Sequence, residues 1–285
     1  MTERKSLYLI DGSALMYRAY FAFIRNRLIN SKGEDTSATF GFVNTLLKLV
    51  RTHHPEYLAI VFDTGRPTFR HELYPEYKAT RQKMPDEMRA QVPRIRESVA
   101  ALGLPLVETE GFEADDVIGT LARRGAEEGY EVFMVTGDKD FMQLVGPHSS
   151  VLDPMKDLIY HPEDVQEKYG IPPERIVDYL SLTGDTSDNI PGVPKVGEKT
   201  ARELLQKFGS LDAILERCDE IPKPSIRVCV SENREQAILS RKLATIDTQV
   251  PVEQDLEKLR FRGFSAESAI DFLREMEFPS LVDAV

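Results

Sequence analysis

The chain has 285 residues, of which 41% are hydrophobic, and its formal net charge is −11. This is enough apolar material for one large domain, or for one domain with a smaller companion. The apolar run 7–10 is too short for a signal peptide and no stretch reaches membrane-spanning length, so no membrane partner is expected. Cys218 and Cys229 fit neither a disulfide framework nor a zinc pattern, and we expect reduced thiols.

The acidic net charge argues at first against a nucleic-acid partner, but the charge is unevenly distributed. Residues 66–96 contain eight lysines and arginines against four acids, and residues 195–207 contain four bases against two acids. The rest of the chain is therefore strongly acidic. This pattern suits a protein that holds a phosphate chain at one place and metal ions at another.

In the first part of the chain, near-continuous apolar runs predict three buried parallel strands, at residues 7–11, 57–63 and 131–138. A helix capped by Thr36 or Ser37 should run to about residue 51, and another should run from about Glu113 to Gly125 or Gly129. Alternating strands and helices predict a doubly wound α/β sheet. Residues 66–103, basic and rich in proline, are interpreted as an excursion from the sheet and not as a core element.

After about residue 172 the strand patterns stop. Helices are expected over residues 174–182, 198–208, 211–217, 234–244 and 266–276. We therefore predict an α/β domain at residues 1–172 and an all-helical domain at residues 173–285.

Each predicted strand ends in an aspartate: Asp11, Asp63 and Asp138. The carboxyl ends of parallel strands lie along one edge of a sheet, where ligands bind. Three carboxylates gathered there would repel one another without a cation between them. The alternative is that each aspartate only caps the helix that follows it.

Six more acids are candidates for the same site: Glu113, Asp115, Asp116, Asp140, Asp185 and Asp188. The first three open a helix, Asp140 follows Asp138 at a spacing that suits one side of an extended segment, and the last two lie on one side of a turn. Nine carboxylates without a histidine favour Mg²⁺ or Mn²⁺ over zinc. A structural calcium site is the alternative.

The pattern of residues 190–201 is typical of a hairpin that binds a phosphate backbone. Gly192 and Gly197 flank a tight turn, a helix begins near Glu198, and Lys195 and Lys199 add positive charge. The string resembles a helix–hairpin–helix element that binds DNA without reading its sequence. An ordinary Gly/Pro loop is the alternative.

The basic excursion carries Tyr77, Lys78 and Arg81. On a helix, Lys78 and Arg81 would point to the same side and reach one phosphate, and an aromatic ring beside them could stack on an unpaired base. Solvated surface charges are the alternative for each residue alone.

Taken together, these segments resemble the 5′-nuclease domain at the N-terminus of bacterial DNA polymerase I, in the flap-endonuclease family. The similar strings are DGSALMYRAYFA, VFDTGRPTFRHELYPEYKATR, EGFEADDVIGTLA, VTGDKDFMQL, TGDTSDNIPGVPKVGEKTA and RKLATIDTQV. They cover essentially the whole chain, in the family's order. Residues 225–231, SIRVCVS, are less charged than the family pattern leads us to expect.

The resemblance implies a PIN-like α/β domain with a helical arch at about residues 66–100, followed by a helical domain with a helix–three-turn–helix. It implies 5′→3′ exonuclease and 5′-flap endonuclease activity in Okazaki-fragment processing and excision repair. The substrate would be DNA with a 5′ flap, a nick or a 5′ end. The protein would be a cytoplasmic, nucleoid-associated bacterial monomer, either free-standing or excised from a longer chain with a polymerase domain.

The resemblance also assigns residues. One metal ion would be held by Asp11, Asp63, Glu113, Asp115 and Asp116, and a second by Asp138, Asp140, Asp185 and Asp188. Lys78, Arg81 and Arg18 would act on the scissile phosphate. DNA would be contacted by Tyr77, Gly192, Val193, Lys195, Gly197, Lys199 and Thr200, and the hairpin could also hold K⁺.

Three other functions are compatible with parts of the pattern. A haloacid-dehalogenase-like phosphatase would share the first acid, but its motif needs Asp-x-Asp and this chain has Asp11-Gly12-Ser13. A DNA-structure-binding module without catalysis would not need a full set of metal ligands. A PIN-like ribonuclease would share the acids but would not need the arch and the hairpin.

Overall fold

The computed structural model describes residues 4–285 and is built on a six-stranded sheet. The strand order is β3-β2-β1-β4-β5-β6, and only β6 runs antiparallel to its neighbour. The strands are β1 (Ser6–Asp11), β2 (Tyr57–Val61), β3 (Leu106–Val107), β4 (Glu131–Val135), β5 (Ser149–Asp153) and β6 (Leu158–Tyr160). The doubly wound, mostly parallel sheet is confirmed. The sequence patterns missed β3, β5 and β6 because these strands are short and β5 opens with two serines.

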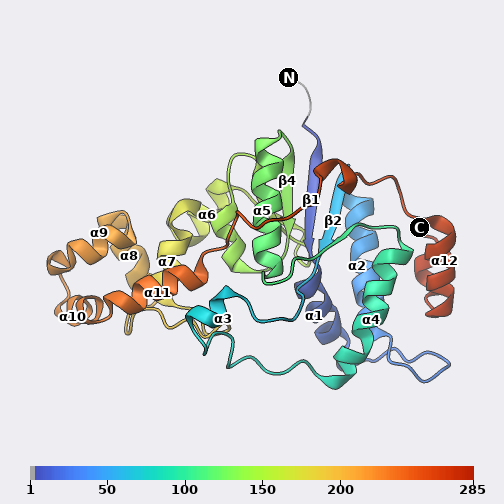
Figure 1. Cartoon of the computed structure of the whole chain (residues 1–285), viewed down its shortest axis with the longest axis horizontal. Coiled ribbons are helices and arrows are strands. Elements are labelled where there is room, and N and C mark those ends of the chain that lie inside the picture. The colour runs from blue at the N-terminus through green and yellow to red at the C-terminus, as the bar shows by residue number, and fades with distance from the viewer. Residues whose placement is uncertain (1–3) are drawn as a thin grey trace.

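Both faces of the sheet are covered by helices (Figure 1). Along β1, Leu7 and Leu9 face one apolar cluster, while Tyr8 and Ile10 face the other. The first cluster includes α5 (Ala114–Glu127). The second includes residues of α1 (Gly12–Phe23), α2 (Ser37–His53), α4 (Asp86–Ala101) and α12 (Ala266–Glu275). This two-sided burial is the reason why the central strands read as unbroken apolar runs.

The two helices predicted in this domain are confirmed as α2 and α5, with Thr36 and Glu113 as their N-cap residues. The interpretation of residues 66–103 as lying outside the core was wrong for α4. Met88, Ile95 and Val99 lie on one side of α4 and are fully buried against the second cluster. The long segment between α3 (Phe69–Leu73) and α4 is free of regular structure, with turns at residues 75–80.

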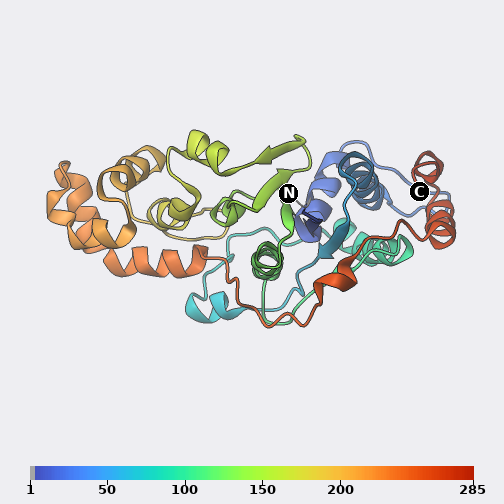
Figure 2. The same cartoon turned by 90° about the horizontal axis from the view of Figure 1, so that it is seen from above.

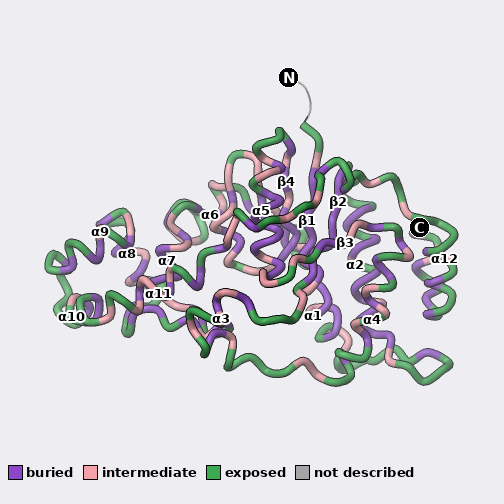
Figure 3. Tube along the Cα trace, in the orientation of Figure 1, coloured by how far each residue is buried: buried purple, intermediate pink, exposed green. Residues whose placement is uncertain are grey.

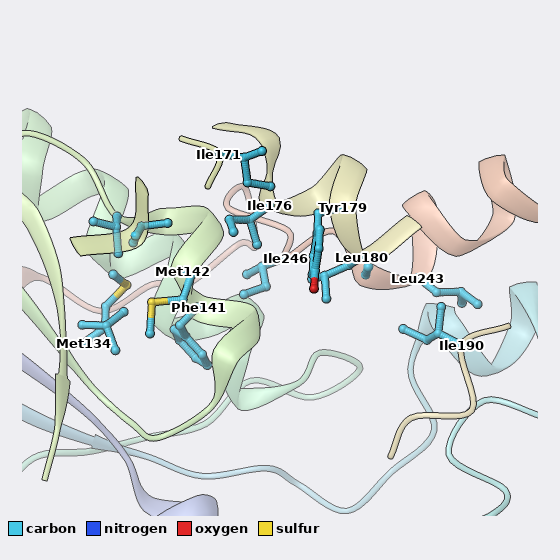
Figure 4. Close-up of a cluster of buried hydrophobic side chains, with 14 of the residues drawn as sticks. Met134, Phe141, Met142, Ile171, Ile176, Tyr179, Leu180, Ile190, Leu243 and Ile246 are labelled. Carbon is cyan, nitrogen blue, oxygen red and sulfur yellow. The ribbon is translucent and has the colours of Figure 1, made fainter. Parts of the chain in front are cut away.

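The second part of the chain is helical, as predicted, and extends away from the sheet (Figure 2). Its helices are α7 (Ile176–Thr183), α8 (Glu198–Phe208), α9 (Leu211–Glu216), α10 (Pro224–Glu232) and α11 (Arg234–Ala244), and α6 (Pro162–Tyr169) precedes them at the end of the predicted α/β domain. Met134 and Phe141 of the sheet domain belong to the same apolar cluster as Tyr179 and Leu180 of α7 (Figure 4). The two parts therefore share one continuous core, which fixes their relative position.

The helical domain at residues 173–285 stays a prediction, and the chain beyond α11 returns to the sheet. Residues 245–262, here called the strap, run back from α11 along α5 to the sheet (Figure 1). Arg123 and Arg124 of α5 donate to strap carbonyls at Thr248, Val252 and Gln254. Beyond the strap, α12 packs on α4, followed by α13 (Pro279–Val282). The chain thus returns to the α/β domain, and burial alternates along the strap (Figure 3).

Cys218 and Cys229 are both buried free thiols. Among residues 4–285, none of the helices has both the length and the apolar character needed to span a membrane.

Candidate active site and metal centre

The three aspartates predicted at strand ends do lie at the carboxyl edge of the sheet. Asp11 is the last residue of β1, and Asp63 and Asp138 follow the ends of β2 and β4. Asp11 also caps α1, because its Oδ1 accepts from Ala14 N at 2.8 Å, and Asp138 caps the 3-10 helix at Lys139–Leu144. Capping and a shared site are therefore compatible. The cap uses one oxygen of each carboxylate, and the side chains still face the same edge.

These acids are close enough to disturb one another's protonation. Burial, reinforced by the charges of Asp63 and Asp138, raises the pKa of Asp11 to about 7. Burial, followed by the charges of Asp11 and Asp138, raises the pKa of Asp115 well above its usual range. Asp138 thus influences the first predicted metal group as well as the second, to which it was assigned. Buried acids that repel each other are stabilised by a bound cation.

The second group consists of Asp138, Asp140, Asp185 and Asp188. Burial, followed by the charges of Asp138 and Asp185, raises the pKa of Asp140 well above its usual range. Oδ1 of Asp140 is buried without a hydrogen-bond partner in the described part of the chain. A buried carboxylate oxygen with no partner is costly. The all-oxygen donor set and this orphaned oxygen fit a hard divalent cation such as Mg²⁺ or Mn²⁺. Asp140 itself lies in a 3-10 helix and not in the extended segment expected from its spacing.

Three acids are engaged by cations of the chain itself. Lys78 Nζ lies 2.8 Å from Glu113, and Lys139 Nζ lies 2.8 Å from Asp185. Arg81 donates to Asp188, with its Nε at 3.1 Å from Oδ1. Within residues 4–285, no three acid, histidine or cysteine side chains converge closely enough to hold a metal ion as they stand. Metal ligation at Glu113, Asp185 or Asp188 therefore requires Lys78, Lys139 or Arg81 to move away from its partner.

Asp116 does not fit the predicted role of metal ligand. Its side chain is fully buried, and both oxygens receive hydrogen bonds from the Arg70 guanidinium at 2.7 Å. Oδ1 also accepts from Asp247 N, and Oδ2 also accepts from Glu113 N. Each oxygen thus has two donors, which fills its acceptor capacity. In this structure Asp116 is therefore the partner of Arg70, a residue outside the predicted site, and its role as a metal ligand stays a prediction.

Tyr77, Lys78 and Arg81 lie in a turn and not in the helix that their spacing suggested. Lys78 has φ of 58°, and its N–H donates to the carbonyl of Asp188 at 2.9 Å. This contact ties the turn to the Asp185–Asp188 loop and brings both basic side chains to the acids. Tyr77 is buried, so the expected stacking of its ring on a base is not compatible with this structure.

Arg18, on α1, lies beside the loop that carries Asp138. Its guanidinium lies against Gly137, where any side chain would collide with it, and 3.7 Å from Asp153 at the end of β5. Asp153 is buried and also pairs with Lys156 at 3.0 Å. The sequence analysis missed Asp153, although a carboxylate at the end of a strand is the same signal that identified Asp11. Because β5 begins with two serines, its apolar run was too short to predict a strand.

The predicted hairpin lies between α7 and α8, and its residues fall into two classes. Gly192 N donates to Ser240 Oγ, its carbonyl accepts from Gln236 of α11, and Val193 is buried. Gly192 and Val193 therefore hold the hairpin in place in this structure, and their direct contact with DNA stays a prediction.

Among the predicted DNA contacts of the hairpin, Lys195, Gly197 and Lys199 are exposed and Thr200 is intermediate, and the acid Glu198 is exposed beside them. Gly197 caps α8 without a side chain, so the first N–H groups of α8 point outward. A helix start of this kind, with two lysines beside it, is suited to an anionic ligand.

Comparison with known proteins places both parts of the chain in one family. Residues 6–170 match the model of the 5′-3′ exonuclease N-terminal resolvase-like domain, and residues 171–267 match the 5′-3′ exonuclease C-terminal SAM fold. The chain is 43% identical to DNA polymerase I of Bacillus subtilis over 99% of its own length. It is 45% identical to DNA polymerase I of Pseudomonas aeruginosa over 97% of its length. It spans about a third of these relatives, 32% and 31% respectively.

Solved structures share the fold. A T5 5′-exonuclease with bound zinc superposes with a TM-score of 0.72 at 19% identity, covering 98% of this chain and 96% of that one. The catalytic core of Rad2 in complex with DNA has a TM-score of 0.66 at 16% identity, covering 99% of this chain and 93% of that one. With both halves matched by the family models and the acids at the sheet edge, the chain belongs to the 5′-3′ exonuclease family.

Proposed function

We propose that this chain is a divalent-metal-dependent 5′→3′ exonuclease and 5′-flap endonuclease that hydrolyses DNA phosphodiesters to 5′-phosphates. One observation carries the proposal: eight carboxylates surround the carboxyl edge of the sheet, and Lys78 and Arg81 are held among them by Glu113 and Asp188. Acids alone would repel a phosphate, whereas acids that hold metal ions beside two basic groups can bind and cleave one.

The metal-holding residues are proposed in two overlapping groups. The first comprises Asp11, Asp63, Glu113 and Asp115, and the second comprises Asp140, Asp185 and Asp188, with Asp138 between them. Two Mg²⁺ or Mn²⁺ ions held there would supply an activated water and stabilise the leaving oxygen. Basic side chains of the protein would contribute further positive charge for the substrate phosphate. Lys78 and Arg81 would exchange their carboxylate partners for the substrate, and Arg18 would meet it from the side of β5.

The hairpin is proposed to hold the duplex part of the substrate. The open N-terminus of α8, with Lys195, Gly197, Lys199 and Thr200, offers N–H groups and charge to a backbone phosphate and does not read bases. The K⁺ ion implied at this hairpin by the family resemblance stays a prediction. The biological substrate would be a 5′ flap, a nick or a 5′ end in Okazaki-fragment processing and excision repair. The protein would act in the cytoplasm on nucleoid DNA, with a polymerase domain as a covalent partner.

Incubation with DNA labelled at a 5′ flap tests this function. Cleavage near the junction in Mg²⁺, and none in chelator, is the expected result. Asp63→Asn, which removes an exposed acid at the sheet edge, should bind the same DNA with little cleavage. Release of inorganic phosphate from a small monoester with intact DNA would instead indicate a phosphatase. Binding without cleavage in any divalent metal would indicate a non-catalytic module.

A further inference from the structure

Arg70, at the start of α3, is a buried cation with an unusually complete set of partners. Its side chain is 3% exposed, and its two terminal nitrogens donate to the two oxygens of Asp116. Its Nε donates to the carbonyl of Leu243 at 2.9 Å, and Nη2 donates to the carbonyl of Thr245 at 2.8 Å. Burial opposes the charge, but the hydrogen bonds and charge of Asp116 outweigh it and raise the pKa of Arg70. The guanidinium thus stays charged inside the protein.

These contacts join three segments that are far apart in the sequence. Arg70 lies at the base of the basic excursion, Asp116 lies in the first turn of α5, and Leu243 and Thr245 lie where α11 passes into the strap. Asp247 N, in the strap, donates to the same Asp116 carboxylate at 2.8 Å. One ion pair therefore fixes the end of α11 on the start of α5 (Figure 1).

Each end of this connection leads to a functional part. At the α5 end, Arg70 Nη1 lies 3.5 Å from Glu113, and Asp116 accepts from Glu113 N. Glu113 is the acid that pairs with Lys78. At the α11 end, Ser240 and Gln236 hold both backbone groups of Gly192 in the hairpin. The metal-binding edge and the duplex-binding hairpin are thus linked through one buried guanidinium.

We propose that Arg70 and Asp116 are positioning residues that set the distance between the hairpin and the acids, and so determine which phosphodiester reaches the metal centre. This inference rests on the proposed function. A positioning role for Asp116 differs from a metal-ligand role, because metal binding would then not need this carboxylate.

Breaking the Arg70–Asp116 pair and replacing it have different physical consequences. Removing one partner leaves a buried charge without compensation, whereas replacing both by apolar side chains of similar volume is often tolerated. The double substitution R70M/D116L should therefore fold. It lacks the donors to the carbonyls of Leu243 and Thr245 and the acceptor for Asp247 N, so α11 is less firmly held on α5.

The test compares wild type, R70M/D116L and D115N by thermal unfolding, by Mn²⁺ binding followed by electron paramagnetic resonance, and by single-turnover cleavage of a 5′-flap DNA. The double variant should bind as many Mn²⁺ ions as the wild type, whereas D115N, the control for a lost ligand, should bind fewer. Cleavage by the double variant should slow by at least about tenfold. Its products should spread over several neighbouring phosphodiesters where the wild type gives one main product.

Wild-type rate with one sharp product in the folded double variant would overturn the proposal, and so would the loss of an Mn²⁺ ion. If the double variant does not fold, R70K is measured in the same way. It keeps the charge beside Asp116 but cannot reach all partners of the guanidinium, so a spread of products is again expected. A single sharp product would contradict the positioning role of Arg70 and Asp116. If the wild type cuts no flap DNA, the proposed function itself is rejected. If the wild type is active and the Arg70 variants cleave with the same rate and the same products, only the positioning role is rejected.

Discussion

The hydroxyl of Tyr77 lies 3.1 Å from Glu113 Oε2 and 3.1 Å from Asp188 Oδ2, so one phenol bridges the two groups of acids. Burial, followed by the charges of both acids, raises the pKa of Tyr77, which keeps the hydroxyl protonated and able to donate. Tyr77→Phe should therefore retain the packed ring but slow cleavage by about tenfold, while unfolding changes by about 1 kcal/mol. Single-turnover kinetics and thermal unfolding measure both quantities. Full activity of Tyr77→Phe would show that the ring alone matters.

Lys78 should matter for rate far more than other bases of the same segment. Replacing Lys78 by Met removes a positive charge held 2.8 Å from Glu113, and the loss of one electrostatic group in a site costs roughly 10²–10³ in rate. Lys83→Met is the matched control, because Lys83 is exposed in the same segment. Equal cleavage rates of the two variants on a 5′-flap substrate would contradict the role proposed for Lys78.

In the presence of a chelator, the free energy of unfolding should fall as the pH rises from 5 to 8. The pKa of Asp11 is raised from 3.8 to about 7, so the folded chain binds this proton more tightly than the unfolded chain. The resulting stabilisation is complete below about pH 4 and is lost as the pH passes about 7. The raised pKa values of Asp115, Asp138 and Asp140 act in the same direction.

The midpoint of thermal unfolding, measured in chelator at each pH, checks this sign. Asp11→Asn should weaken the dependence on pH. Mg²⁺ at about 100 times its dissociation constant should restore roughly 2.7 kcal/mol at pH 8. A midpoint that rises with pH in chelator would show that the acids are not stabilised by protonation.

The hairpin depends on two glycines whose backbones touch. A side chain at Gly184 would collide with Ile190 and Gly192, and one at Gly192 would collide with Gly184. Both have positive φ, so Gly192→Ala should cost at least about 1–3 kcal/mol and reduce duplex binding. Gly209→Ala separates the two causes, because Gly209 has φ of 89° but open space around it. The control should lose stability without a comparable loss of DNA affinity, as measured by unfolding and by fluorescence anisotropy.

The lysines of the hairpin should control binding to duplex DNA irrespective of sequence. Replacing Lys195 and Lys199 by Glu should weaken binding and flatten its dependence on salt, because fewer counterions are released. Lys258→Glu, on the exposed surface of the strap, is the control. Titrations at several salt concentrations give the slopes, and unchanged affinity of the double variant would contradict the role of the hairpin.

Local sequence patterns predicted the elements whose signals lie within a few residues. The bounds 198–208 and 234–244 agree with α8 and α11, because apolar spacing and end residues are local properties. The positions of Asp11, Asp63 and Asp138 at one edge followed from the geometry of parallel strands. Short strands such as β3, with two residues, carry too little pattern to be recognised.

The sequence by itself determined the parallel sheet, the acids at its edge, the glycine hairpin and, through its motifs, the family. Only the tertiary structure decided which acids are available. Asp116 and Arg70 are 46 residues apart, and their pairing depends on how α3, α5 and α11 pack together. The same holds for the burial of Tyr77 and for the return of the strap to the sheet. Periodicity reports which side of an element is apolar, whereas the choice of a partner is set by the free energy of packing the whole chain.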